Sequence, residues 1–135
     1  MVKFLSPEWV DTAKEIVLKE LDPVKDLKGA TTSFLLVVTN IPPDGTIMSL
    51  YFSVMNGKLM EMAWEERDVS SERKAAFTVI GNYDSFVQIV KGEMSIVGAL
   101  LKNRVQFKGD TMKALSFAQP IERINDCLRK IQTVY

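Results

Sequence analysis

The chain has no histidine and a single cysteine among its 135 residues. Without histidine, Ser-His-Asp and Cys-His nucleophile systems are excluded, and so are the imidazole ligands of most catalytic zinc sites. Because Cys127 has no second cysteine to pair with, an internal disulfide and a cysteine zinc cluster are excluded as well. No phosphate-loop or calcium-loop spacing is present, so we expect neither a cofactor nor a metal.

The chain also lacks net charge, since 17 Lys and Arg balance 17 Asp and Glu. This balance excludes the large excess of Lys and Arg that a general nucleic-acid binder needs, and we expect no nucleic-acid partner. The charge is uneven along the chain, with −1 over residues 1–30, −3 over 31–100 and +4 over 101–135. The basic last third would suit an anionic headgroup, although solvated helix faces give the same count.

Long hydrophobic runs are absent as well. The longest apolar run with the character of a strand is Phe34–Val38, so we expect no signal peptide and no transmembrane segment. The final Thr133-Val134-Tyr135 does not resemble a peroxisomal tripeptide. We therefore expect a cytoplasmic protein. Its 47% hydrophobic content is sufficient for one core, which favours a single domain over residues 1–135.

Capping residues and hydrophobic periodicity predict mixed secondary structure. Ser6-Pro7 favours a helix start, and Leu21-Asp22-Pro23 favours its end. We expect strands over residues 33–39, 48–54, 58–64, 75–80 and 104–108 and helices over 83–90 and 93–102. A final helical region should fill the rest of the chain, with Phe117 to Ile131 at helical spacing and a kink or restart at Pro120. Asn56-Gly57 predicts a hairpin turn. The fold class is α+β, with a single five-stranded, mostly antiparallel sheet covered by helices.

Candidate catalytic groups are few. On a regular strand, Glu61 and Glu65 face away from Met62 and the other apolar residues of their segment, so both carboxylates should lie on the solvent side with ordinary acidity. Tyr51 has no activating base at a diagnostic spacing, and Cys127 is expected to be an inert, partly buried thiol. These features favour a protein that is not an enzyme.

The methionines are more informative than the polar residues. Met48, Phe52, Met60, Met62 and Trp64 fall on alternate positions of two neighbouring strands, so they should line the covered face of the sheet. The unbranched thioether side chain of methionine adapts to ligands of variable shape, so a wall rich in methionine would suit a ligand-binding tunnel. Filling of the core is the alternative explanation for the same pattern.

Three stretches near the C-terminus resemble the signature of the sterol carrier protein type two (SCP2) family. They are Asp84–Gly92, Ala99–Asp110 and Met112–Leu115. The resemblance is specific for residues 84–115, and the predicted order of elements matches that family over nearly the whole chain. Asn103 stands where the family usually has glycine. Asparagine is the next best residue for a left-handed backbone position.

This resemblance implies an SCP2-like fold and a non-enzymatic intracellular carrier. Its ligand would be a lipid, a fatty acid or an acyl thioester, held in an apolar tunnel between the sheet and the C-terminal helices. Candidate lining residues follow from the side of each element that should face the helices and from the matching positions in the family. They are Met48, Phe52, Met60, Met62, Trp64, Phe77, Met94, Val97, Leu101, Leu115 and Phe117. Lys102, Arg104 and Lys113 are candidate contacts for a headgroup.

Two other functions stay open. One is an interaction or accessory domain whose tunnel is filled by side chains, which the lack of a cavity beyond about 300 Å³ would favour. The other is an enzyme on a hydrophobic substrate, such as an isomerase, with Tyr51 or an inward-turned Glu61 as acid or base. Membrane contact should be transient at most, because the polar side of the first helix mixes both signs of charge. The sequence leaves the oligomeric state open.

Overall fold

The computed structural model describes residues 1–135 and has a five-stranded sheet at its centre. The elements are β1 (Val2–Lys3), α1 (Pro7–Glu20), β2 (Thr32–Ile41), β3 (Thr46–Met55), β4 (Lys58–Glu65), β5 (Phe77–Asn82), α2 (Tyr83–Lys91), α3 (Ile96–Leu101), β6 (Val105–Lys108), α4 (Thr111–Ser116), α5 (Ala118–Leu128) and β7 (Thr133–Val134). The strand order is β4-β3-β2-β5-β6, with β2 and β5 parallel and the other neighbours antiparallel. The predicted fold class is confirmed.

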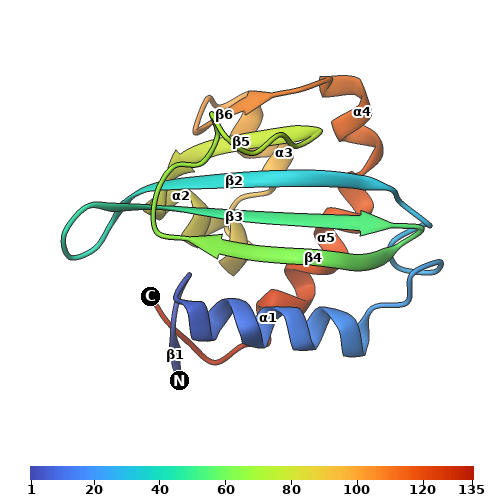
Figure 1. The fold of residues 1–135 in the computed structure, drawn as a ribbon, viewed down its shortest axis with the longest axis horizontal. Coiled ribbons are helices and arrows are strands. Elements are labelled where there is room, and N and C mark those ends of the chain that lie inside the picture. The colour runs from blue at the N-terminus through green and yellow to red at the C-terminus, as the bar shows by residue number, and fades with distance from the viewer.

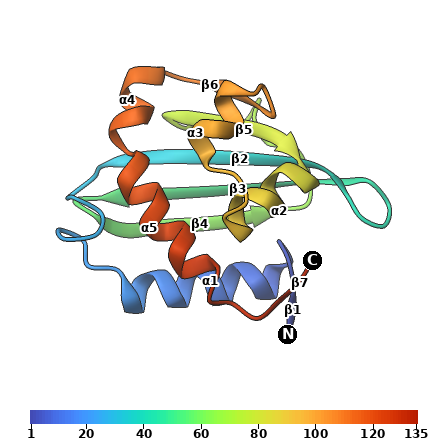
Figure 2. The same cartoon turned by 180° about the vertical axis from the view of Figure 1, so that it is seen from behind.

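The helices lie on one face and one edge of this sheet. Figure 2 shows α2, α3 and α5 in front of the strands, and Figure 1 shows α1 running along the β4 edge. Helix α1 contacts both β4 and α5, so the N-terminal helix and the last helix close the same side of the sheet. The two chain ends meet where β1 pairs with β7.

Local sequence signals account for several of these elements. The Ser6 side chain caps α1 by accepting a hydrogen bond from the backbone N–H of Trp9. Asn56 and Gly57 both have positive φ, at 51° and 80°, as the predicted hairpin turn requires. Asn103 has a φ of 55°, so the asparagine expected in a left-handed position is found in one.

The last helical region differs in part from the prediction. The break comes at Phe117, between α4 and α5, and Pro120 occupies the third position of α5. Proline is tolerated there because the first turn of a helix has no intrahelical partner for its N–H groups. Ile131 lies beyond α5, and the chain continues as β7. A strand of two residues carries no periodicity, so the β1–β7 pair had no signal in the sequence.

A β-bulge in β4 changes the side of the sheet to which Met60 belongs. The register pairs Ser53 with Glu61 but Val54 with Leu59, which leaves Met60 as an extra residue. Because side chains alternate along a strand, one extra residue reverses the facing beyond it. Leu59 therefore shares the helix-covered face with Met62, and Met60 is 59% exposed. The expectation that Met60 lines the covered face was wrong.

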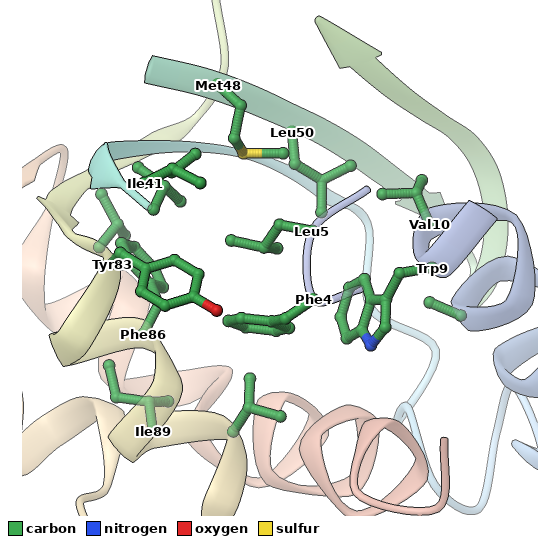
Figure 3. Packing of buried hydrophobic residues seen from close by; sticks show 14 of the residues in the cluster. Phe4, Leu5, Trp9, Val10, Ile41, Met48, Leu50, Tyr83, Phe86 and Ile89 are labelled. Carbon is green, nitrogen blue, oxygen red and sulfur yellow. The ribbon is translucent and has the colours of Figure 1, made fainter. Parts of the chain in front are cut away.

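The core joins the N-terminal segment to the helices and the sheet. Figure 3 shows Phe4 between Trp9 of α1 and Tyr83 of α2, with Met48 and other strand residues above them. The Phe4 ring lies 5.0 Å from the Trp9 ring and 5.7 Å from the Tyr83 ring, measured between centroids. Aromatic pairs at these separations add to the stability gained from apolar burial.

The opposite face of the sheet is covered by a loop rather than by helices. Leu35 and Val37 of β2 pack there against Val69, which lies between β4 and β5. The Ser49 hydroxyl donates a hydrogen bond to the carbonyl oxygen of Arg67 at 2.6 Å and accepts one from the N–H of Val69 at 3.1 Å. These bonds hold the loop against the outer face of the sheet.

Candidate functional site

An apolar cavity lies between the sheet, α1 and α5. Its volume is about 80 Å³, and all eleven lining residues are hydrophobic. This inner cavity is lined by Trp9, Ala13, Val17, Leu36, Leu50, Phe52, Val54, Leu59, Met62, Ile124 and Leu128. Apolar cavities have no groups to hold water by hydrogen bonds, so the space suits hydrocarbon better than water.

Regular spacing in three elements builds this lining. Trp9, Ala13 and Val17 lie four residues apart in α1, which places them on one face of the helix. Residues 124 and 128 have the same spacing in α5, and positions 50, 52 and 54 alternate along β3. The bulge at Met60 turns Leu59 inward, where it joins Leu36 and Met62 to complete the wall.

A wider groove opens near the junction of α4 and α5. This mouth groove has a volume of about 540 Å³ and is lined by Thr31, Thr32, Ser33, Val54, Ala76, Phe77, Lys113, Ser116 and Phe117. Val54 also lines the inner cavity, so the two hollows share one wall. The groove therefore combines hydroxyl groups and one cation with an apolar wall that continues into the inner cavity.

Aromatic rings connect the two hollows. The ring of Phe117 meets those of Phe34 and Phe77 edge to face, with centroids 6.4 and 5.9 Å apart. The Phe34 ring stacks on Phe52 at 5.1 Å. Since Phe117 lines the mouth groove and Phe52 lines the inner cavity, apolar rings fill the path from one hollow to the other.

The polar atoms of the mouth groove are only partly engaged. The hydroxyl oxygens of Thr31 and Ser33 accept hydrogen bonds from the N–H groups of Asn56 and Ala76, at 3.0 and 2.9 Å. The Ser116 hydroxyl donates to the carbonyl oxygen of Lys113. No carboxylate lies within 4.0 Å of the Lys113 ammonium, which leaves that cation unpaired.

The structure divides the predicted lining among separate hollows. Phe52 and Met62 line the inner cavity, whereas Phe77 and Phe117 line the mouth groove together with Lys113. Met48 and Trp64 instead border a third hollow of about 310 Å³ beside residues 3–7. There the indole N–H of Trp64 donates to the carbonyl oxygen of Leu5 at 2.9 Å.

The other predicted residues line none of these three hollows. Met60 borders a groove on the outside of α1, and Met94 is half-buried against the main core. Val97 is half-buried in α3, Leu101 is 80% exposed, and Leu115 is also exposed. Of the two remaining candidate headgroup contacts, Lys102 is exposed at the end of α3, and the Arg104 guanidinium donates to the side-chain oxygen of Gln88.

Sequence reasoning missed all five residues of the helical lining. Trp9, Ala13 and Val17 carry a clear helical period, and so do Ile124 and Leu128, but the prediction looked for the lining mainly on strands and near the C-terminus. The helical period was a usable signal for these five residues. Leu59 had no such signal, because its inward facing depends on the bulge.

No titratable side chain lines the inner cavity. Glu61 pairs with Arg73 on the outer face of the sheet, and the Arg73 guanidinium lies 3.8 Å from the centre of the Tyr51 ring. The hydrogen bond to Glu61 is the main cause that raises the pKa of Arg73. Burial raises the pKa of the Cys127 thiol, and the nearby Glu20 carboxylate adds to this effect. A buried thiol held neutral is a poor nucleophile, as the sequence predicted.

The structure shows neither a cluster of metal ligands nor a membrane-spanning helix. No three or more Cys, Asp or Glu side chains are grouped so that they could hold a metal ion. None of the helices has both the length and the apolar character needed to span a bilayer.

Comparisons with known proteins identify one family. The model of the SCP-2 sterol transfer family matches residues 14–122. No curated protein sequence matches the chain.

Solved structures resemble the chain in fold. A conserved hypothetical protein from Thermus thermophilus, named in its description as a candidate sterol carrier protein, superposes with a TM-score of 0.80 at 15% identity, over 99% of this chain and 93% of its own. A crystal structure of sterol carrier protein 2 gives 0.77 at 16% identity, over 96% and 99%. The solution structure of palmitated SCP2L2 from Aedes aegypti gives 0.58 at 16% identity, over 86% and 94%.

Proposed function

The chain belongs to the SCP-2 sterol transfer family, and on that premise we propose that it is a non-enzymatic intracellular carrier of a single lipid or fatty acyl chain. The ligand is a lipid, a fatty acid or an acyl thioester. Its hydrocarbon lies between the sheet, α1 and α5, and no side chain of the protein reacts with it. The expected cytoplasmic location stays a prediction.

The inner cavity is the observation that carries this proposal. Its walls are entirely hydrophobic, and they come from three strands of the sheet and from α1 and α5. Burial of hydrocarbon stabilises a complex by about 0.8 kcal/mol per methylene, so ten methylenes contribute roughly 8 kcal/mol before the cost of association is subtracted. A carrier of this kind needs apolar area and no reactive group.

The ligand must enlarge the hollow that is present. A cavity of about 80 Å³ is smaller than the roughly 300–1,000 Å³ of typical ligand sites. The aromatic path offers the additional space, because Phe117 belongs to the junction of two helices and α4 has no buried residue. We expect Phe117 to turn aside and the acyl chain to run from the mouth groove to the inner cavity.

A related structure supports an acyl ligand. The Aedes aegypti protein is described as palmitated and has the same fold, which makes a chain of similar length a reasonable first ligand for this protein. Palmitic acid is therefore the first probe to test.

The small volume favours a second candidate function. With side chains filling most of the space between sheet and helices, the domain would serve as an interaction or accessory module and bind no lipid. Lipid binding in solution separates this candidate from the carrier.

Tryptophan fluorescence provides the test. Trp9 lines the inner cavity and Trp64 does not, so palmitic acid at micromolar concentration should shift emission in the Trp64→Phe variant but not in Trp9→Phe. Met62→Glu places a charge in the cavity wall and should weaken binding at least tenfold, because an unpaired buried carboxylate is strongly unfavourable. Glu61→Gln changes the adjacent residue on the opposite face and should leave binding intact.

A panel of palmitic acid, a fluorescent sterol and an acyl thioester covers the ligand classes. Saturable binding of any of them, lost in Met62→Glu, supports the carrier. If none of them binds the wild-type protein, the carrier is excluded and the accessory domain is favoured.

Membrane contact accompanies the proposal as a transient event. Leu18 and Met60 are exposed and border the groove on the outside of α1, where Lys58 is the only charged lining residue. The exposed polar side of α1 carries both signs of charge, which makes electrostatic attraction to anionic lipid slight. Weak sedimentation with vesicles, little changed by their anionic lipid content, is the expected result.

A further inference from the structure

The mouth groove has a chemical composition that the inner cavity lacks. Among its nine lining residues are four hydroxyl side chains and one lysine, and none of the nine is acidic. Its apolar side consists of Val54, Ala76 and the rings of Phe77 and Phe117. The groove is therefore amphipathic, with polar donors beside the start of the aromatic path.

The hydrogen-bond pattern leaves donors free in this groove. The Thr31 and Ser33 oxygens already accept from backbone N–H groups, and neither hydroxyl donates to another protein atom. A hydroxyl that accepts one bond still has its own proton to donate. Together with the Lys113 ammonium, the groove offers at least three unassigned donor groups and no negative charge.

From this composition we propose that the mouth groove binds the carboxylate of a long-chain fatty acid, with Lys113 as its ion-pair partner and the hydroxyls of Thr31 and Ser33 as hydrogen-bond donors. A carboxylate is an acceptor only, and its single charge matches the single free ammonium. A doubly charged phosphate would leave one charge without a partner. The tail runs past Phe117 and Phe34 toward Phe52 and the inner cavity.

The inference rests on the proposed function, since it assigns a headgroup site to the same ligand. It also makes a separate claim, because a carrier that recognised only the hydrocarbon would bind an acid and an uncharged analogue equally well. The groove would then be an entrance without selectivity. The effect of replacing Lys113 on binding of the acid distinguishes these two possibilities.

Matched ligands and matched variants provide the test. Binding of palmitic acid and of 1-hexadecanol is measured by Trp9 emission and by calorimetry, for the wild type, Lys113→Met, Lys113→Arg and Lys102→Met. We expect Lys113→Met to weaken palmitic acid binding about five- to tenfold and to leave 1-hexadecanol unchanged. Lys113→Arg should retain most of the affinity for the acid. Lys102→Met removes the same charge from an exposed position outside the groove and should have little effect.

The outcomes separate this inference from the proposed function. If the wild type binds the acid and the alcohol equally and Lys113→Met changes neither, the headgroup site is wrong while the carrier stands. Equal losses in Lys113→Met and Lys102→Met would also overturn the site, because they would indicate a general charge effect. If neither ligand binds the wild-type protein, the headgroup site is wrong, and the carrier is wrong too when the sterol and the acyl thioester also fail to bind.

Discussion

Both faces of the five-stranded sheet bury apolar side chains, yet they are covered in different ways. On the outer face, a loop fixed through Ser49 packs Val69 against β2, and the ion pairs above it are exposed to water. On the inner face, separate helices approach from several directions and leave the inner cavity between them. The comparison teaches that a bonded loop packs tightly against the central strand, where Leu35 and Val37 are fully buried, whereas independent helices leave an apolar space between them.

Neighbouring leucines of β2 provide the strongest way to break this comparison. Leu35→Ala removes a fully buried side chain (0% exposed) from the outer face and should lower the free energy of unfolding by about 2–5 kcal/mol. Leu36→Ala enlarges the inner cavity and should cost less, since Leu36 is only half-buried. Urea denaturation measures both changes.

Ligand binding then distinguishes the two leucine variants. Saturating palmitic acid should stabilise Leu36→Ala at least as much as the wild type, by about 2.7 kcal/mol at a hundredfold excess over Kd. Palmitic acid affinity should be unchanged in Leu35→Ala. If both variants alter the affinity equally, the two faces do not differ in the way we describe.

Ser49→Ala tests what holds the outer face closed. The hydroxyl of this residue, which is 1% exposed, satisfies one carbonyl and one N–H of the covering loop. Its removal leaves those groups unpaired and should cost about 1–3 kcal/mol in the free energy of unfolding. Faster hydrogen exchange around Val69, with unchanged lipid binding, is the accompanying result. Altered lipid binding would instead mean that a change on the outer face affects the inner cavity.

The smallest expected effect concerns Cys127 on the helix side. Burial raises the pKa of its thiol in the folded protein, so the unfolded chain releases the proton first. This contribution to stability is complete below the unfolded pKa of about 8.5 and is lost as the pH rises from there through the folded value. The wild type should therefore lose more stability than Cys127→Ala between pH 8 and 10, as measured by denaturation. Rapid labelling of the native thiol at pH 7 would contradict a buried, neutral Cys127.

Much of the fold could be predicted because its signals are local. Ser6-Pro7 favours a helix start, and Asn56-Gly57 favours a hairpin turn. Asn103 tolerates the left-handed backbone conformation found there, and none of these three preferences depends on tertiary contacts. The alternation in β3 also predicted which side faces the helices, and Glu61 and Glu65 lie opposite the outer-face residues Ser53 and Ser49, as expected. These features depend on residues adjacent in the chain.

The candidate site could be predicted only in part. Phe52 and Met62 were placed correctly on the helix-covered face, but the lining from α1 depends on how that helix packs against β4 and α5. The bulge at Met60 is a property of two paired strands and not of β4 alone. Met48 carries the expected alternation yet is 1% exposed in the main core, away from the inner cavity.

By itself, the sequence determined the chemistry that is possible: no imidazole, one thiol, balanced charge and enough apolar residues for a sheet with helices on it. Only the tertiary structure decided where the apolar cavity and the groove lie, by bringing α1 and α5 together over the sheet and by placing Lys113 beside Phe117 in the mouth groove. The physical reason is that periodicity fixes which side of an element is apolar, whereas a cavity is the space left when several such sides meet.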